Sequence, residues 1–213
     1  MIKKLSNIRT EYSGADLNKN NVKNDPIKQF NIWFKEAIKQ DIKEPNAMIL
    51  STVKKNKYPR SRTVLLKKIN KEGFIFFTNY KSNKGEEIDI NPNVSLNFLW
   101  KKIERQVIIE GVAKKISNKI STKYFNTRPR ESQIAAWASI QSIEIENKNI
   151  IDNNFKNIEK KYKNKKVIPK PDYWGGYVVI PNKIEFWQGK RSRLHDRICY
   201  RFDKIWKKYR LSP

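Results

Sequence analysis

The chain contains one histidine, in the stretch RSRLHDR at residues 191–197. An imidazole exchanges protons near neutral pH, and guanidinium groups beside it bind phosphate or carboxylate with two parallel hydrogen bonds. If the stretch is a β-strand, Arg193, His195 and Arg197 share one face because alternate side chains point the same way. This pattern predicts a cationic, ligand-facing site. A single histidine on a strand more often has a structural role than a ligand-binding one. The distribution of arginines along the chain therefore has to be considered as well.

The arginines gather in short groups, whereas the lysines are scattered. Only 11 of the 46 basic residues are arginine, and most lie near Arg60, Arg128 and residues 191–201. In KYFNTRPRES (123–132), a helix end is followed by Arg-Pro and then by a serine at a new helix start. Such a sequence supplies backbone N–H groups, a hydroxyl and a guanidinium, which together suit an anion. The alternative is an ordinary helix start with a surface arginine.

The net charge of +25 also suggests a nucleic-acid partner, because clustered lysine and arginine displace counterions from a phosphate backbone. Here the lysines occupy turns and helix faces, as in KKNK and KNKK, so most of the excess is interpreted as solvated surface. A basic RNA- or DNA-binding barrel remains the alternative from a different class. This chain lacks the pattern of aromatic residues interleaved with basic ones that proteins binding single-stranded nucleic acid use. Specific nucleic-acid binding is therefore not expected.

Size and composition predict a globular protein. With 213 residues, 38% of them hydrophobic, the chain can bury a core as a single domain. Its one cysteine, Cys199, excludes an intrachain disulfide. No signal-type segment and no run of ~18 apolar residues is present, so a cytoplasmic protein without a membrane span is expected. No residues are assigned to a metal.

The first half of the chain reads as an arm, a helix and a series of strands. Residues 1–24 are polar and without periodicity, which predicts a flexible arm. Asp25-Pro26 is a helix start, and apolar residues at helical spacing extend the helix to about Gln40. A short helix is expected at residues 82–90. The expected strands are AMILSTV (47–53), SRTVLLKKI (61–69), GFIFFTN (73–79), VSLNFLW (94–100) and RQVIIEGVAKKI (105–116).

Short connections favour an antiparallel meander that closes into a barrel. On the strand 61–69, Arg62 and Lys67 are five residues apart, so a regular strand would place them on opposite faces. Helices are expected from Ser117 to the break at residues 128–129, over ESQIAAWAS (131–139) and over about 144–163. The final strands YVVIP, KIEFWQG, RLHDRICYRF and IWKKYRL then complete the barrel. The fold class is therefore α+β and mainly β, with one domain at residues 25–213.

Six stretches in order resemble the pyridoxamine 5'-phosphate oxidase family. They are RTVLLK (62–67), FFTN (76–79), ERQVIIEG (104–111), KYFNTRPRESQIAAWAS (123–139), WGG (174–176) and IEFWQGKRSRLHDR (184–197). The resemblance implies an antiparallel split β-barrel homodimer, with FMN at the interface and dimerisation strands at about 174–213. It also implies vitamin B6 chemistry: pyridoxamine or pyridoxine 5'-phosphate is oxidised to pyridoxal 5'-phosphate. Hydride passes from C4' to flavin N5, and dioxygen is reduced to hydrogen peroxide.

The resemblance also assigns roles to residues. The positions that match FMN contacts are Arg62, Thr63, Val64, Leu65, Leu66, Lys67, Phe77, Thr78, Lys84, Gln106, Gln141, Ser142, Trp187 and Arg197. Those that match substrate contacts are Arg9, Tyr12, Lys67, Tyr124, Arg128, Ser132, Arg193, Leu194 and His195. Arg193 and His195 are expected to position the substrate over the flavin. Without the resemblance, Gln106 reads equally well as solvent-facing and Trp187 as core.

Two departures from the family pattern stand out. Asn83 occupies a position where the family usually has arginine, which predicts weaker FMN binding unless another cation compensates. Arg9 and Tyr12 match an arm that covers the substrate, but the basic run expected after them reads DLNKNN. The nearest alternative function is another split-barrel flavoprotein, such as a flavin reductase or an oxidase of a different small molecule. Two phosphates, one on the cofactor and one on the substrate, nevertheless account for the grouped arginines.

Overall fold

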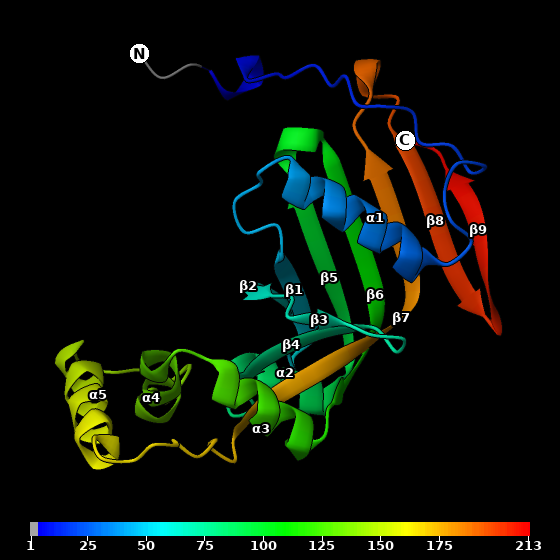
Figure 1. The fold of residues 1–213 in the computed structure, drawn as a ribbon. Coiled ribbons are helices and arrows are strands. Elements are labelled where there is room, and N and C mark those ends of the chain that lie inside the picture. Colours follow the sequence, from blue (N-terminus) through cyan, green and yellow to red (C-terminus); the bar gives the residue numbers. More distant parts are fainter. Residues whose placement is uncertain (1–3) are drawn as a thin grey trace.

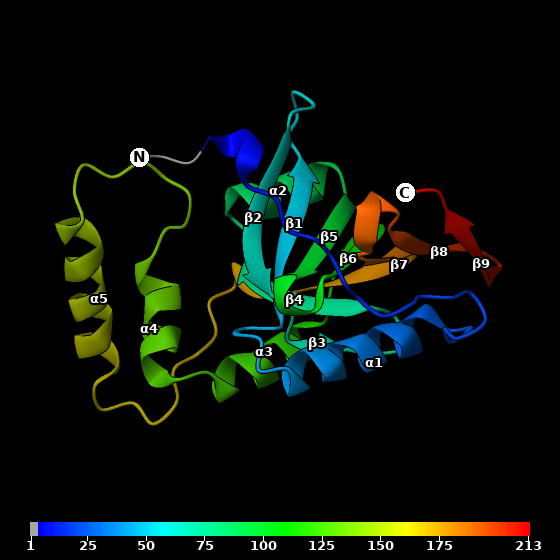
Figure 2. The ribbon, with the colours of Figure 1, turned by 90° about the horizontal axis from the view of Figure 1, so that it is seen from above.

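A computed structural model describes residues 4–213. The described residues form one nine-stranded sheet that curls into a half-open barrel, with helices around it (Figures 1 and 2). The strands are β1 (Ala47–Val53), β2 (Pro59–Leu65), β3 (Lys68–Ile69), β4 (Phe74–Asn79), β5 (Asn93–Trp100), β6 (Arg105–Lys115), β7 (Trp174–Gln188), β8 (Asp196–Asp203) and β9 (Ile205–Leu211). The α-helices are α1 (Pro26–Lys39), α2 (Asn83–Ile90), α3 (Asn118–Thr127), α4 (Arg130–Ala138) and α5 (Asn149–Tyr162). Single 3-10 turns are η1 (Leu5–Asn7), η2 (Lys101–Ile103) and η3 (Arg191–Arg193).

Every strand pair is antiparallel, as the short connections predicted, but the order is not a simple meander. The sheet runs β2-β1-β5-β6-β7-β4-β3, and β8 and β9 extend it from β7. The long strand β7 makes this possible, because Phe74–Asn79 pairs with its first half and Asp196–Asp203 with its second. The final strands therefore lie beside β7, away from β1. The split-barrel α+β fold expected from the sequence is confirmed.

The main core lies between the curled sheet and α1. Asp25 caps this helix by accepting hydrogen bonds from the N–H groups of residues 27 and 28, and Pro26 occupies its first turn. Phe30 is fully buried, with its ring centroid 4.9 Å from those of Phe74 and Phe98. Edge-to-face pairs of this kind stabilise a core beyond the area they bury. The helix therefore covers one face of the curled sheet and closes the main core.

Helices α3, α4 and α5 form a separate layer beside the barrel, and α4 and α5 lie alongside each other (Figure 2). Their core contains Phe125, Ile134 and Tyr162, and it reaches the barrel through Trp174 at the start of β7. Ser117 caps α3, and the break at Arg128-Pro129 separates α3 from α4 as predicted. Residues of α3 and α4 face strands β2 and β4 across a cavity between this layer and the barrel.

The N-terminal segment packs along the C-terminal strands instead of standing free (Figure 1). Leu17 and Val22 are buried. The Leu17 N–H donates to Asp196 at 3.0 Å, and the Tyr200 hydroxyl donates to the carbonyl of Lys23 at 2.6 Å. The polar composition of this segment predicted a flexible arm, but Leu17 and Val22 anchor it against the C-terminal strands. Residues 1–3 of the expected arm lie outside the described residues.

Three other expectations about elements were wrong in detail. The expected strand 61–69 breaks after Leu65, because the Leu66 N–H donates to Asn46 and the Lys67 N–H donates to Ile75 as the chain crosses to β4. Lys67 is therefore not on the strand that carries Arg62, and the argument from odd spacing does not apply. The strands expected at YVVIP and KIEFWQG are the single strand β7, with a register shift opposite residues 110 and 111. The helix expected from about residue 144 begins at residue 149.

Candidate functional site

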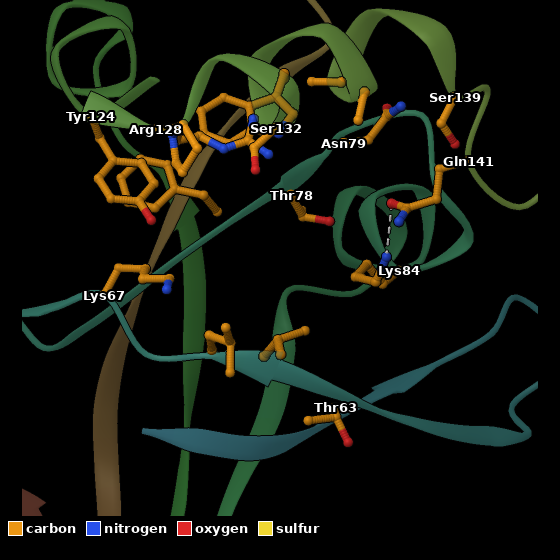
Figure 3. Close-up of a pocket in the computed structure, with 17 residues that line it drawn as sticks. Thr63, Lys67, Thr78, Asn79, Lys84, Tyr124, Arg128, Ser132, Ser139 and Gln141 are labelled. Atoms are coloured by element: carbon orange, nitrogen blue, oxygen red, sulfur yellow. Dashed lines mark hydrogen bonds between the residues drawn. The ribbon is translucent and has the colours of Figure 1, made fainter. Parts of the chain in front are cut away.

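A cavity of about 530 Å³ lies between the barrel and the helical layer (Figure 3). Strands β2 and β4, the first turn of α2, the α3–α4 break and one face of α4 all contribute side chains to it. The lining residues are Thr63, Val64, Leu65, Lys67, Phe77, Thr78, Asn79, Lys84, Tyr124, Arg128, Pro129, Ser132, Ala135, Ala136, Ser139, Gln141 and Trp174. Segments from residue 63 to residue 174 thus meet at one place.

One wall of the cavity is a stack of aromatic rings. The Phe77 ring lies 3.9 Å from that of Tyr124 and 5.4 Å from that of Trp174, with interplanar angles of 18° and 11°. Gly176 permits this packing, since a Cβ there would lie 2.9 Å from the Phe77 ring. The stack provides a flat apolar surface on which a planar ring can lie.

Arg128 is the cation at one end of the cavity. Its guanidinium carbon lies 4.7 Å from the centroid of the Trp174 ring, and burial lowers its pKa, partly offset by the neighbouring Tyr124. Its Nη1 is buried and has no hydrogen-bond partner among the described residues. A buried guanidinium nitrogen without an acceptor is costly, so this atom marks a place for an anionic oxygen. Ser132 lies beside it in Figure 3, and Lys67 lies farther away, past the Tyr124 ring.

Lys84 is the cation at the other end. It lies in the first turn of α2, which Ser82 caps, and it is only 9% exposed. Its Nζ donates to the Ser82 hydroxyl and to the side-chain oxygen of Gln141, each at 3.1 Å (Figure 3). Burial, together with the nearby Arg62 charge, lowers the pKa of Lys84 to about 8. A buried ammonium with two neutral acceptors favours an incoming anion.

Arg62 lies behind this end of the cavity and does not line it. Its guanidinium donates to Glu87 at 2.9 Å, to the Leu50 carbonyl at 3.3 Å and to the Thr52 hydroxyl. Ser142, which was predicted to contact FMN, instead accepts from the Asn83 N–H at 3.3 Å. Leu66 is buried in the main core. The FMN contacts expected of Arg62, Leu66 and Ser142 stay predictions.

A second set of predicted residues forms a row across the strands β6, β7 and β8. Gln106 pairs with Trp187, and Trp187 pairs with Arg197, so the three side chains share one face. Arg197 donates two hydrogen bonds to Glu185, at 2.7 and 3.1 Å, and a third to the Ser212 carbonyl at 2.9 Å. The hydrogen bond with Glu185 raises the pKa of Arg197. This ion pair holds the guanidinium in one orientation.

His195 stands at the end of this row. Its ring centroid is 4.6 Å from that of Trp187 and 5.4 Å from that of Tyr12. Its Nδ1 accepts a hydrogen bond from the Lys190 N–H at 3.1 Å, so in the neutral ring Nε2 carries the proton. Burial, followed by the Arg193 charge, lowers the pKa of His195. The imidazole is therefore a neutral donor at pH 7.

The expectation that Arg193, His195 and Arg197 alternate on one strand was wrong. Residues 191–193 form a single 3-10 turn, in which Ser192 and Arg193 have positive φ values of 56° and 63°. The strand β8 begins only at Asp196. His195 and Arg197 nevertheless lie near each other, because both flank Trp187. Arg193 stays close through its guanidinium, 5.9 Å from the Tyr12 ring centroid.

Most of the predicted residues thus fall into two sets within one chain, and Arg62, Leu66 and Ser142 belong to neither. The cavity contains Thr63, Val64, Leu65, Lys67, Phe77, Thr78, Lys84, Tyr124, Arg128, Ser132 and Gln141. The row contains Gln106, Trp187, Arg197, His195, Arg193 and Tyr12. The turn that carries His195 and the layer that carries Arg128 lie at opposite ends of the molecule (Figure 1). Leu194 is exposed, and Arg9 donates to the Ser6 carbonyl without joining either set.

Sequence reasoning missed part of the cavity lining. The residues it did not select are Asn79, Pro129, Ala135, Ala136, Ser139 and Trp174. One signal was available: Ser132, Ala135, Ala136 and Ser139 recur at helical spacing, and this stripe of small residues leaves room beside α4. Trp174 was part of a matched motif but had no role assigned to it.

Comparison with known proteins gives consistent results over nearly the whole chain. Residues 34–162 match the family model described as pyridoxamine 5'-phosphate oxidase. Residues 174–213 match the pyridoxine 5'-phosphate oxidase C-terminal dimerisation region. A Hydrogenovibrio crunogenus protein named pyridoxine/pyridoxamine 5'-phosphate oxidase 2 is 50% identical over 210 residues, covering 98% of each chain. A Leptospira interrogans protein named pyridoxine/pyridoxamine 5'-phosphate oxidase is 47% identical, covering 99% of each chain.

Solved structures agree on the fold. PhzG from Burkholderia lata, solved in complex with tetrahydrophenazine-1-carboxylic acid, superposes with a TM-score of 0.88 at 26% identity, over 94% of this chain and 100% of that one. An FMN-binding protein of Nostoc punctiforme, related to pyridoxamine 5'-phosphate oxidase, has a TM-score of 0.68 at 13% identity, over 86% of this chain and 97% of that one. The second likeness supports the fold alone.

Proposed function

Because the chain belongs to the pyridoxamine 5'-phosphate oxidase family, we propose that it oxidises pyridoxamine and pyridoxine 5'-phosphates at C4' and releases pyridoxal 5'-phosphate. The protein is an FMN-dependent oxidoreductase and a homodimer. The family relationship does not assign residues to roles. The roles of individual residues are inferred from the geometry of the cavity and of the strand row.

The residues present fit FMN and a phosphorylated pyridine. The aromatic stack and the apolar residues of β2 suit planar rings, and cations stand at two separate ends of the cavity. Lys84, Thr78 and Gln141 would hold the cofactor, with Lys84 toward its phosphate. When bound, FMN supplies the redox chemistry: it accepts hydride from C4' at N5, and dioxygen restores its oxidised form with release of hydrogen peroxide.

Arg128 is the observation that carries the substrate assignment. A phosphate oxygen would satisfy its orphaned Nη1, and Tyr124 and Ser132 add hydroxyls beside it. At this end of the cavity the substrate would be held by its phosphate, so that the pyridine ring reaches toward the aromatic wall. Positioning of this kind contributes much of an enzyme's rate, since the reacting atoms are brought together in advance.

The two sets of residues would then meet across the dimer interface. In one chain, none of the described row residues lines the cavity. A partner chain can bring its own Gln106, Trp187, Arg197 and His195 to the open side of the cavity, which completes one site from two protomers. His195, as a neutral donor, would orient the substrate, and Arg197 would contact the cofactor.

Mixed dimers test this arrangement. An Arg128→Gln chain and an Arg197→Gln chain, each strongly impaired as a homodimer, are unfolded together, refolded and assayed at a substrate concentration well below KM. If each site takes Arg128 from one chain and Arg197 from the other, half of the dimers are mixed and each has one intact site. About a quarter of the wild-type activity should then return. No recovery would place both residues in one protomer and reject the shared site.

The proposed reaction is tested by the visible absorption spectrum of the FMN-loaded protein. Anaerobic addition of pyridoxamine 5'-phosphate should bleach the bound flavin band, and admission of air should restore it with formation of hydrogen peroxide. A bound flavin that stays oxidised would move the assignment to another substrate. Reduction by tetrahydrophenazine-1-carboxylic acid instead would favour a substrate of the kind that PhzG binds.

No helix in the described part of the chain is long and apolar enough to cross a membrane. A cytoplasmic location, and the absence of specific nucleic-acid binding, stay predictions.

A further inference from the structure

A cluster of charged side chains lies behind the Lys84 end of the cavity, and it includes Arg60, which does not line that cavity. Arg60 and Arg62 lie two residues apart on β2, so both project from the same face of the strand. Both reach the buried carboxylate of Glu87 on α2, at 3.7 Å from Arg60 and 2.9 Å from Arg62. With Lys84, three cations therefore surround one acid, which leaves an excess of positive charge.

The two arginines differ in how fully they are paired. Arg62 is enclosed, with 19% of its side chain exposed, and it donates to Glu87, Thr52 and Leu50. Arg60 is 44% exposed, and its distance to Glu87 is too long for a strong hydrogen bond. The guanidinium of Arg60 is therefore the one in this cluster that is still able to take an external anion.

Asn83 fixes the position of that guanidinium. With the amide oxygen turned toward Arg60, it accepts from the two terminal nitrogens at 2.6 and 3.2 Å. Asn83 is the first residue of α2 and directly precedes Lys84, which lines the main cavity. Arg60, Asn83 and Glu87 together line a second cavity of about 610 Å³. Arg60 therefore lies close enough to Lys84 for its charge to contribute to lowering the pKa of that residue.

We propose that Arg60, held by Asn83 and Glu87, is a further ligand of the FMN phosphate and completes the cationic end of the cavity with Lys84. This inference rests on the proposed placement of the phosphate beside Lys84. A phosphate dianion there has the charge to offset both cations, and a guanidinium fork suits its oxygens. It also explains how the chain tolerates Asn83: the amide is not a lost contact but the group that positions an arginine from β2.

The test compares FMN with riboflavin, which lacks the phosphate. Each is titrated into apoprotein, and binding is followed by the quenching of flavin fluorescence. Arg60→Gln should raise the Kd for FMN by about tenfold, as expected for loss of one partly exposed charge-assisted contact, and leave the Kd for riboflavin unchanged. Asn83→Ala, which removes only the positioning amide, should shift the Kd for FMN in the same direction by a smaller factor.

Lys54→Gln is the matched control. Lys54 lines the same second cavity as Arg60 and carries the same charge, so it tests whether the overall electrostatic field alone matters. It should change the Kd for FMN by less than about twofold. The proposal is overturned if Arg60→Gln matches Lys54→Gln, or if it weakens riboflavin as much as FMN, which would indicate a structural role.

Lys84→Met separates this proposal from the one on which it rests. If Lys84→Met weakens FMN binding and Arg60→Gln does not, Arg60 is excluded and the phosphate site stands. If neither substitution changes FMN binding, the phosphate is not at this end of the cavity, and both proposals fail. The riboflavin titration also reports whether each variant is folded.

Discussion

The cavity and the strand row are both rich in cationic side chains, but the two regions pair them differently. In the row, Arg197 is held by two hydrogen bonds to Glu185, and His195 accepts from a backbone N–H. In the cavity, Arg128 has a buried nitrogen with no acceptor among residues 4–213, and the two acceptors that Lys84 contacts there are neutral. Groups that orient a ligand can be fixed in advance by internal partners, whereas groups that bind an anion must keep capacity for it. The side chains of the row are therefore preorganised by internal partners, whereas the cations of the cavity keep hydrogen-bonding capacity for an anion.

The largest effect should follow from removing the unpartnered guanidinium. Arg128→Gln should lower kcat/KM for pyridoxine 5'-phosphate about 100-fold, mainly through KM, because a buried charged contact to the phosphate is lost. FMN affinity should not change. Steady-state kinetics of this variant and of Lys123→Gln, which removes an exposed charge from α3, would show it. Equal effects of the two substitutions would mean that Arg128 is an ordinary surface charge.

The second prediction concerns pH and Lys84. Since its pKa is about 8, below the ordinary 10.5, the ammonium is present at pH 7 and is lost as the pH rises through 8. The second pKa of a phosphate is near 6, so the ligand keeps its charge in this range. The Kd of the apoprotein for FMN should therefore rise above pH 8, by up to about tenfold per pH unit. Fluorescence titrations at pH 6.5 to 9.5 should show this rise in the wild type and a flat profile in Lys84→Met.

A smaller effect is expected in the preorganised row. If His195 orients the substrate as a neutral donor, His195→Gln keeps a donor and should lower kcat/KM only about tenfold, whereas loss of a general base costs about 100-fold to 10,000-fold. Because the pKa of His195 is lowered from 6.5, kcat/KM should show no ionisation from this residue between pH 7 and 9. A loss above 100-fold with an altered pH profile would make His195 a proton acceptor and contradict the comparison.

The smallest effect tests the internal pairing itself. Glu185→Gln should lower the free energy of unfolding of the apoprotein by about 1–2 kcal/mol, because it breaks a partly buried, charge-assisted pair with Arg197. Lys183 lies on β7, as Glu185 does, and Lys183→Gln breaks a more exposed pair with Glu110 of β6, which should cost less than about 1 kcal/mol. Urea unfolding measures both. Equal changes would show that the Arg197 pair is no tighter than a surface contact.

Local signals in the sequence predicted most of the fold. Asp25-Pro26 marked the start of α1, and β-branched and aromatic runs marked β1, β4, β5 and β6 to within about two residues. Errors came where long-range contacts override local pattern. The chain leaves β2 after Leu65 because residues 66 and 67 pair with other segments, and Leu17 anchors a segment whose composition is polar.

The sequence by itself determined which residue types are available for chemistry and where they gather: the grouped arginines and the single histidine can be read without coordinates. Only the tertiary structure decided how they are divided, with Arg128 and Lys84 at a cavity and His195 and Arg197 on a distant row. It also decided that Arg60 faces Asn83, 23 positions along the chain. Residue type and spacing specify what a side chain is able to bind, whereas its free or paired state depends on neighbours that only folding brings together.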